Sequence, residues 1–317
     1  MKNYFIINPG AGSGKKIVEL KERIEAVCRA KGAEFEIYLT KKMGDATEFV
    51  KSKCESISEK IRFYACGGDG TLNEVASGAV EYDNAAVGLI PGGTGNDFLR
   101  CFEGKESFSN IGSQLDATEE RIDAVKCGDR YMFNMFNTGF DCEVAAKASS
   151  LKHLPLVSSS LAYILGVVVK LIQKPGAEFE VSLDDGPFDG KKLLLATVSN
   201  GRFCGGGFRS SPRARLADGL LDVCFIKNVS RMKFISIVSK YRSGEYIDME
   251  SLQDIIEYRR AKKVELRFEK PCNVCLDGEI LKTDSLSMHV IPKKLRMLVP
   301  KGARFSEAES PSGAVTV

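Results

Sequence analysis

Hydrophobic positions in the first 122 residues follow two patterns that alternate along the chain. Short apolar runs predict β-strands, and stretches with apolar residues every three or four positions predict helices. Strand followed by helix, repeated several times, is typical of a parallel sheet with helices on both faces. The expected strands are 4–8, 35–39, 61–66 and 86–90, and the expected helices are 17–27, 45–59 and 71–80.

The pattern changes after residue 122. A hairpin is expected around Gly128-Asp129, an apolar helix over 159–173, and an amphipathic helix over 230–243. The remaining apolar runs predict an antiparallel, β-rich second half with strands at 179–183, 192–198, 221–225, 264–268 and 285–290. We therefore expect two domains, 1–122 and 123–299, with the end of the chain, about 300–317, as a candidate to pack back on the first.

Composition narrows the class of protein. The chain has 317 residues, of which 44% are hydrophobic, enough for two cores. A net charge of +3 argues against bulk nucleic-acid binding. Local basic clusters, such as Lys293-Lys294, are read as solvated faces, and contact with an anionic membrane stays open. The ten cysteines show no zinc-site spacing, and we interpret them as buried thiols of a reducing cytosol. The longest apolar stretch, 161–172, is too short to span a bilayer.

Glycine-rich segments follow three of the predicted strands. Asn8-Pro9-Gly10-Ala11-Gly12 comes after the first strand and leads into a helix, where backbone amides suit a phosphate. Its spacing is neither that of a Walker A loop nor that of a dinucleotide-binding fingerprint. A flexible strand-to-helix turn remains an equally good interpretation.

The second segment, Gly67-Gly68-Asp69-Gly70-Thr71, comes directly after the third strand. Thr71 and Glu74 have the spacing of a capping box, and Asp45 with Glu48 has the same spacing at the preceding helix. An acid beside phosphate-binding amides would repel the phosphate unless a cation such as Mg²⁺ lies between them. The alternative is a glycine-rich turn with an exposed aspartate.

The third segment, Pro91-Gly92-Gly93-Thr94-Gly95-Asn96-Asp97, repeats the device after the fourth strand. Thr94 and Asp97 again have capping-box spacing. Neighbouring parallel strands would bring the second and third segments together at the carboxyl edge of the sheet, the usual ligand crevice of such folds.

GGDGTLNE followed by PGGTGNDF resembles the diacylglycerol kinase catalytic domain of bacterial lipid kinases. The wider group includes sphingosine and ceramide kinases, with NAD kinases as distant relatives. The resemblance extends from residue 4 to about residue 300. It implies an α/β fold: a Rossmann-like parallel-sheet domain, similar to phosphofructokinase and NAD kinase, followed by an antiparallel β-sandwich domain.

The same resemblance implies a nucleotide site in the first domain. Thr40, which by pattern alone is only a strand-ending residue, enters the site through this resemblance. The implied nucleotide-binding residues are Asn8, Pro9, Gly10, Gly12, Thr40, Gly67, Gly68, Asp69, Gly70, Thr71, Leu72, Asn73, Glu74, Gly92, Gly93, Thr94, Gly95, Asn96 and Asp97.

In the second domain, Asp277-Gly278-Glu279 has the sequence of a tight hairpin turn. The resemblance implies that it is also catalytic. Phosphoryl transfer to an alcohol requires a carboxylate that orients the hydroxyl and takes its proton. We assign Glu279 as this base, with Asp277 supporting it or competing for the role.

Two metal sites follow from the resemblance. A structural Mg²⁺ would be bound by Arg215, Asp218 and Leu220, the first and last through backbone carbonyls. An Asp-Gly turn without metal is the alternative. The catalytic Mg²⁺ would arrive with ATP and be held by Asp69 and Asp97, directly or through water.

The leading hypothesis is an ATP-dependent kinase of diacylglycerol or a related lipid. The alternatives are a kinase of a sphingoid base or NAD, and a nucleotide-binding regulator without catalysis. The expected partners are a lipid at a membrane surface, met by peripheral contact, and no nucleic acid; a homodimer stays open. The expected location is the cytoplasm, transiently at the inner face of the membrane.

Overall fold

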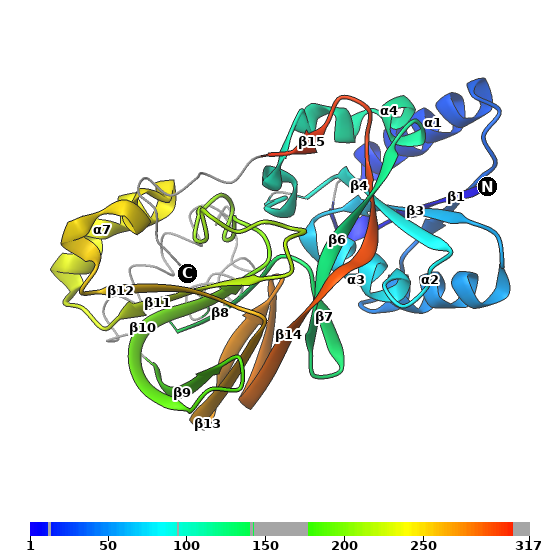
Figure 1. Ribbon diagram of the computed structural model, residues 1–317. Helices are drawn as coiled ribbons and strands as arrows, with labels where there is room; N and C mark the ends of the chain where they lie inside the picture. The colour runs from blue at the N-terminus through cyan, green and yellow to red at the C-terminus, as the bar shows by residue number, and fades with distance from the viewer. Residues whose placement is uncertain (12–13, 94, 140–141, 143–176, 307–317) are drawn as a thin grey trace. The chain divides into compact units, whose positions relative to one another are not determined.

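The computed structural model describes residues 1–11, 14–93, 95–139, 142 and 177–306 (Figure 1). The chain divides into two compact units. The first contains Met1–Ala124, Leu216–Gly219 and Ile291–Glu307, and the second contains Val125–Arg215 and Leu220–Val290. The predicted apolar helix over 159–173 lies outside the described residues.

The first unit is built on a parallel sheet with the strand order β2-β1-β3-β4-β14. Its buried strands are continuous apolar runs, as a sheet covered on both faces requires. The strands are β1 Lys2–Ile7, β2 Phe35–Leu39, β3 Ile61–Gly67, β4 Ala85–Pro91 and the end of β14 Glu279–Val299.

Helices cover both faces of this sheet (Figure 1). On one face, Ile24 of α1 and Ile111 of α4 share a core with Phe5 and Tyr64. On the other face α2 and α3 lie side by side, and Phe49 of α2 meets the ring of Tyr4 edge-on. The helices are α1 Gly14–Ala30, α2 Asp45–Ser56, α3 Asp69–Ala79 and α4 Ile111–Leu115.

Shorter elements complete the first unit. They are the single-turn helices η1 Pro9–Ala11, η2 Phe98–Cys101 and η3 Lys105–Ser109, and the strands β5 Phe102–Glu103 and β15 Arg304–Phe305. β15 pairs with β5, so the segment from residue 291 to residue 306 belongs to this unit.

The second unit is an antiparallel β-sandwich. Its strands run in the order β12-β11-β10-β8-β13-β14, β9 bridges β10 and β13, and β6 forms a hairpin with β7. They are β7 Arg130–Met132, β8 Met135–Gly139, β9 Ala177–Leu183, β10 Asp189–Ser199, β11 Leu221–Lys227, β12 Ile256–Ala261, β13 Lys263–Leu276 and the end of β6 Thr118–Cys127, whose residues 118–124 belong to the first unit.

Alternation along the strands gives this unit two apolar faces. Val223 and Phe225 of β11 point into the sandwich core, whereas Cys224 and Ile226 lie under the helix α7 Arg231–Ser243. The short helices η4 Glu245–Asp248 and η5 Glu250–Leu252 follow α7. The predicted fold class, a parallel α/β domain and an antiparallel β-sandwich, is therefore confirmed.

Three details differ from the sequence analysis. β12 was not predicted, because its alternation is hidden by Arg259 and Arg260. β14 has 21 residues instead of six, because its polar middle keeps strand pairing without an apolar signal. Asp45 is not the N-cap of α2: Gly44 holds that position in the left-handed region, and the Asp45 carboxylate accepts hydrogen bonds from the amide of Lys41 (2.7 Å) and the hydroxyl of Tyr38 (3.0 Å).

Candidate active site

Four strands of the first unit end at the same edge of the sheet. Asn8 follows β1, Thr40 follows β2, Gly68 follows β3 and Gly92 follows β4, and the parallel register aligns these ends. The Thr40 amide donates to the carbonyl of Ile7 at 3.0 Å. The carboxyl edge therefore collects most of the residues for which the sequence predicts nucleotide binding.

The second and third glycine segments are in direct contact. The Gly92 amide donates to the Gly67 carbonyl at 2.8 Å. A Cβ on Gly93 would lie 2.7 Å from the Cα of Gly68, closer than side-chain carbons approach backbone atoms. Glycine is thus required at position 93 for a packing reason, in addition to any ligand.

Asp69 links the same two segments. One carboxylate oxygen accepts the amide of Asp97 and the other accepts the amide of Phe98, each at 3.0 Å. These amides open η2, so the acid satisfies donors that would otherwise be exposed at a helix start. The carboxylate therefore has a structural partner without any metal ion.

The first glycine segment is tied to the second. The Asn8 side chain donates to the hydroxyl of Thr71 at 3.1 Å and accepts the Gly10 amide at 2.9 Å. Thr71 is 5% exposed and lies inside α3, which begins two residues before it. Leu72 is buried too, so any contact of that residue with a nucleotide would be through its backbone.

The capping-box predictions in this region are wrong. Gly68 is the N-cap of α3 and forms no side-chain cap, and Asp97 precedes η2 without a side-chain cap. The Glu74 carboxylate instead accepts the Ala46 amide at 3.3 Å, in the first turn of α2. Extended backbone at Gly68 lets α3 start earlier, which turns Thr71 inward. Thr94 and Gly12 lie outside the described residues.

A cavity of about 450 Å³ opens at this edge. Asn8, Gly92 and Gly93 line it, together with the basic side chains of Lys16 and Arg23 from α1. Glu19 is the acid among its lining residues. The two cations make this part of the edge suited to an anion.

In the second unit, Asp277 is held by a loop between β7 and β8. Its carboxylate accepts three backbone amides, from Phe133 (2.7 Å), Asn134 (3.0 Å) and Met135 (2.8 Å), and the residue is 8% exposed. Asp277 and Gly278 both have positive φ, 46° and 92°, and they join Leu276 to Glu279 as a two-residue hairpin turn. The turn that joins the two strands therefore also carries the carboxylate that the three amides bind.

Glu279 has a different environment. Its side chain is 29% exposed, and one carboxylate oxygen lies 2.9 Å from a guanidinium nitrogen of Arg130 in β7. The sequence analysis missed Arg130, which follows the Gly128-Asp129 turn and carries no local signal. The motif thus presents one buried, amide-bound carboxylate and one accessible carboxylate with a cationic neighbour.

The predicted structural metal loop is divided between the units: Asp218 belongs to the first, and Arg215 and Leu220 belong to the second. Asp123, also missed by the sequence analysis, is fully buried and accepts the amides of Gly219 and Lys293, each at 2.7 Å. The pKa of Asp123 is raised above its ordinary value, mainly because burial disfavours the charged form. The two amides act in the opposite direction, and the nearby charge of Asp218 adds to the rise. An isolated aspartate inside the apolar run Ile122–Val125 was the available signal.

In the described ranges, no three His, Cys, Asp or Glu side chains form a group that could hold a metal ion. Mg²⁺ bound jointly by ATP phosphates needs fewer protein ligands. A Cβ on Gly95 would lie 3.3 Å from an oxygen of Asp69 and 3.9 Å from one of Asp97. The missing Cβ leaves room beside both acids, which fits a cation held there directly or through water.

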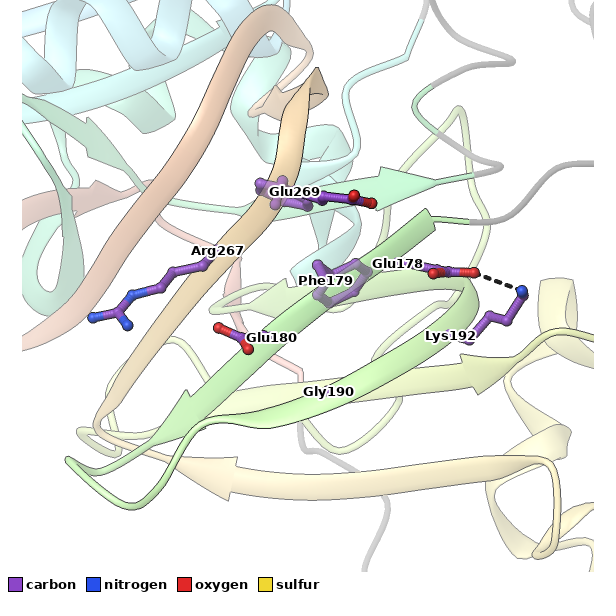
Figure 2. A pocket seen from close by; sticks show the side chains of 8 residues that line it. Glu178, Phe179, Glu180, Gly190, Lys192, Arg267 and Glu269 are labelled. Carbon is purple, nitrogen blue, oxygen red and sulfur yellow. Dashed lines mark ion pairs between the residues drawn. The ribbon is translucent and has the colours of Figure 1, made fainter.

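A second cavity, of about 540 Å³, lies in the sandwich unit between β9, β10 and β13 (Figure 2). It contains none of the residues predicted for the site. Glu178, Glu180 and Glu269 line it, and Glu178 pairs with Lys192 at 2.5 Å. The three carboxylates outnumber the two cations of the lining, Lys192 and Arg267, which makes this cavity less suited to a phosphate than the one at the sheet edge.

Comparison with protein families gives two matches that together cover most of the chain. Residues 2–127 match the diacylglycerol kinase catalytic domain, and residues 134–299 match the YegS C-terminal NAD kinase beta sandwich-like domain. The chain therefore belongs to the family of kinases that combine these two domains. Such an enzyme is a phosphotransferase with an alcohol group as acceptor.

Individual relatives agree with this placement. A protein of Alcanivorax borkumensis named "Probable lipid kinase YegS-like" is 28% identical over 86% of this chain and 90% of its own length. A Pseudomonas aeruginosa protein of the same name is 29% identical over 88% and 89%. A crystal structure of a diacylglycerol kinase from Bacillus anthracis superposes with a TM-score of 0.67 at 21% identity, covering 94% of this chain and 96% of that chain. The last similarity concerns the fold alone.

In the part of the chain with described coordinates, no helix has the length and apolarity needed to cross a membrane. All ten cysteines are free thiols, and every one except Cys204 and Cys272 is buried.

Proposed function

We propose that this protein transfers the γ-phosphate of ATP to the hydroxyl of diacylglycerol or a closely related lipid, giving phosphatidate or its analogue. The observation that carries the proposal is the contrast within Asp277-Gly278-Glu279. Three amides occupy Asp277, which leaves Glu279 as the carboxylate of the motif that is accessible to a substrate hydroxyl.

The glycine segments would hold the nucleotide. Amides at the start of α3 suit the phosphates, and Lys16 and Arg23 add positive charge to the cavity. Asp69, through its bonds to the amides of Asp97 and Phe98, keeps the two segments in register. Asp69 and Asp97 would also hold Mg²⁺, which neutralises the phosphate charge when bound.

Glu279 would act as the base. Its carboxylate takes the hydroxyl proton as the acceptor oxygen bonds to the γ-phosphorus, and the bond to the bridging oxygen breaks to release ADP. Arg130 would orient this carboxylate. Asp277 would act indirectly, by fixing the turn that presents Glu279.

The test is a transfer assay with purified protein, γ-labelled ATP, Mg²⁺ and a panel of acceptors. Diacylglycerol, a monoacylglycerol and a sphingoid base would be presented in mixed micelles, and NAD in solution. Label in phosphatidate supports the proposal. If the label appears in the sphingoid base or NAD and none appears in phosphatidate, the labelled molecule is the acceptor instead of diacylglycerol. No Mg²⁺-dependent transfer to any acceptor would favour a regulator that binds nucleotide without catalysis.

A further inference from the structure

Helix α7 of the second unit has one face buried in the unit and one face open. Phe234, Ile237 and Tyr241, at helical spacing, pack on side chains of β10 and β11 such as Leu195 and Ile226. Figure 1 shows α7 on the outside of these strands. Ser230 caps the helix through the Lys233 amide, and Gly244 ends it in the left-handed conformation. The helix is thus fixed in orientation by both its packing and its ends.

The open face is apolar at its beginning. Met232 is 76% exposed and Ile235 is 52% exposed, and they lie one turn apart. Each residue turns a helix by about 100°, so Ser236, Ser239 and Ser243 continue the same face. These positions are exposed as well. Small hydroxyl side chains next to two protruding apolar ones leave the apolar pair as the outermost groups of the face.

Positive charge borders this face. The helix contains Arg231, Lys233, Lys240 and Arg242 and no acidic residue. By helical position, Lys233 and Lys240 lie on one side of the open face and Arg242 on the other. Lys240 pairs with Glu245, whereas neither Lys233 nor the exposed Lys227 that precedes the helix forms an ion pair with a carboxylate of the described residues.

Two basic side chains in other clusters of the chain form ion pairs with carboxylates. Lys294 pairs with Glu81 at 2.9 Å, and Lys263 pairs with Asp185 at 2.5 Å and Glu265 at 3.3 Å. Ion pairs with protein carboxylates leave them less able to attract an anionic surface than Lys227 and Lys233 are.

We infer that the open face of α7, formed by Met232 and Ile235 with Lys233 and Arg242 on either side and Lys227 shortly before the helix in sequence, docks the protein on an anionic lipid bilayer. The inference rests on the proposed function in one respect: a kinase of a membrane lipid must reach a bilayer. Two apolar side chains are far too few for a protein interface, which buries about 800 Å² per partner. They are sufficient for shallow insertion at a lipid surface, where basic residues add electrostatic attraction.

Sedimentation of the full chain with vesicles tests this inference. Vesicles of equal parts phosphatidylcholine and phosphatidylglycerol should bind the protein, and vesicles of phosphatidylcholine alone should bind it at least about ten-fold more weakly. Met232→Ser/Ile235→Ser should lower binding to the mixed vesicles by about ten-fold or more. Lys227→Gln/Lys233→Gln should lower it by several-fold and reduce its dependence on salt.

A matched control comes from the other unit. Val18 and Met43 are 54% and 80% exposed, so Val18→Ser/Met43→Ser removes a similar apolar area elsewhere. It should leave vesicle binding unchanged, and thermal unfolding should be unaltered in every variant. Equal loss in the control and in the α7 variant, or no loss in either, would overturn the inference. So would a dimer of the wild type in light scattering that the α7 substitutions convert to a monomer without affecting vesicle binding.

The proposed docking surface and the proposed kinase activity can be rejected independently of each other. The α7 double variant should keep the kcat of the wild type on a short-chain acceptor dispersed in solution, because none of its substitutions touches the predicted site. If vesicle binding depends on α7 but the protein has no lipid kinase activity, the docking surface is supported and the proposed function is rejected.

Discussion

The acidic residues of the two units fall into two groups, and the difference tells which carboxylate is available for chemistry. Asp69 in the first unit and Asp277 in the second both use their carboxylate oxygens to accept backbone amides of another loop. Glu279, two residues after Asp277, contacts an arginine side chain instead. Within Asp277-Gly278-Glu279, one acid therefore shapes the loop and the other is accessible to a substrate.

The largest expected effect separates these groups directly. Glu279→Gln should lower kcat for phosphoryl transfer by about 10³-fold, because the amide cannot take the hydroxyl proton. ATP binding, measured by calorimetry, should be nearly unchanged. Glu269→Gln, which removes an exposed carboxylate of the same unit, is the control. Unaltered turnover in Glu279→Gln would remove this residue from the mechanism.

Contact between the glycine segments of the first unit gives the next effect. Gly93→Ala places a Cβ 2.7 Å from the Cα of Gly68, so one segment must shift. A displacement near 1 Å at a phosphate site lowers kcat/KM for ATP by about 10²-fold. Gly190→Ala, where a Cβ meets nothing within 4 Å, should retain wild-type kinetics. Equal kinetics for both variants would show that the segments adapt without cost.

Asp277→Asn tests the amide-bound carboxylate itself. Asparagine tolerates the positive φ of 46°, so the substitution changes the charge and one acceptor while leaving the turn unstrained. The side-chain NH2 of the new asparagine would face the Phe133 backbone amide, which then loses its charge-assisted hydrogen bond. The free energy of unfolding should therefore fall by about 3 kcal/mol. Urea denaturation measures this change. Glu279→Gln should leave the unfolding midpoint in place, and a shift as large as that of Asp277→Asn would erase the distinction.

The smallest effect concerns Asp45, the first residue of α2, whose carboxylate also accepts a backbone amide. The Lys41 amide, followed by the Tyr38 hydroxyl, lowers the pKa of Asp45 below its ordinary value of 3.8. A lowered folded-state pKa stabilises the protein above the unfolded pKa, and this stability is lost as pH falls through the folded pKa. Asp45→Asn should therefore cost about 1 kcal/mol at pH 7 and progressively less below about pH 4. If Asp45→Asn lowers the free energy of unfolding equally at pH 7 and below about pH 4, the carboxylate does not have this stabilising role.

Much of the fold could be predicted from the sequence because the hydrophobic patterns that indicate strands and helices are local. The apolar runs of β1, β3 and β4 and the helical spacing in α1 gave the parallel sheet, and alternation gave the antiparallel strands of the second unit. Helix starts were less predictable. At Asp45 and Thr71 the local spacing suggested caps, but the Asp45 carboxylate binds Lys41 and Tyr38, which precede it in the chain, and the Thr71 hydroxyl binds Asn8, 63 positions away.

The sequence by itself determined the class of the protein: glycine segments after parallel strands argue for nucleotide phosphates, and their resemblance to lipid kinases agrees with the family matches. The tertiary structure alone decided what each acid does. Whether a carboxylate is occupied depends on amides that lie far away in the sequence, such as Phe133 for Asp277, 144 positions apart. Spacing along a chain records neighbours in sequence, and hydrogen bonds of this range depend on the folded backbone.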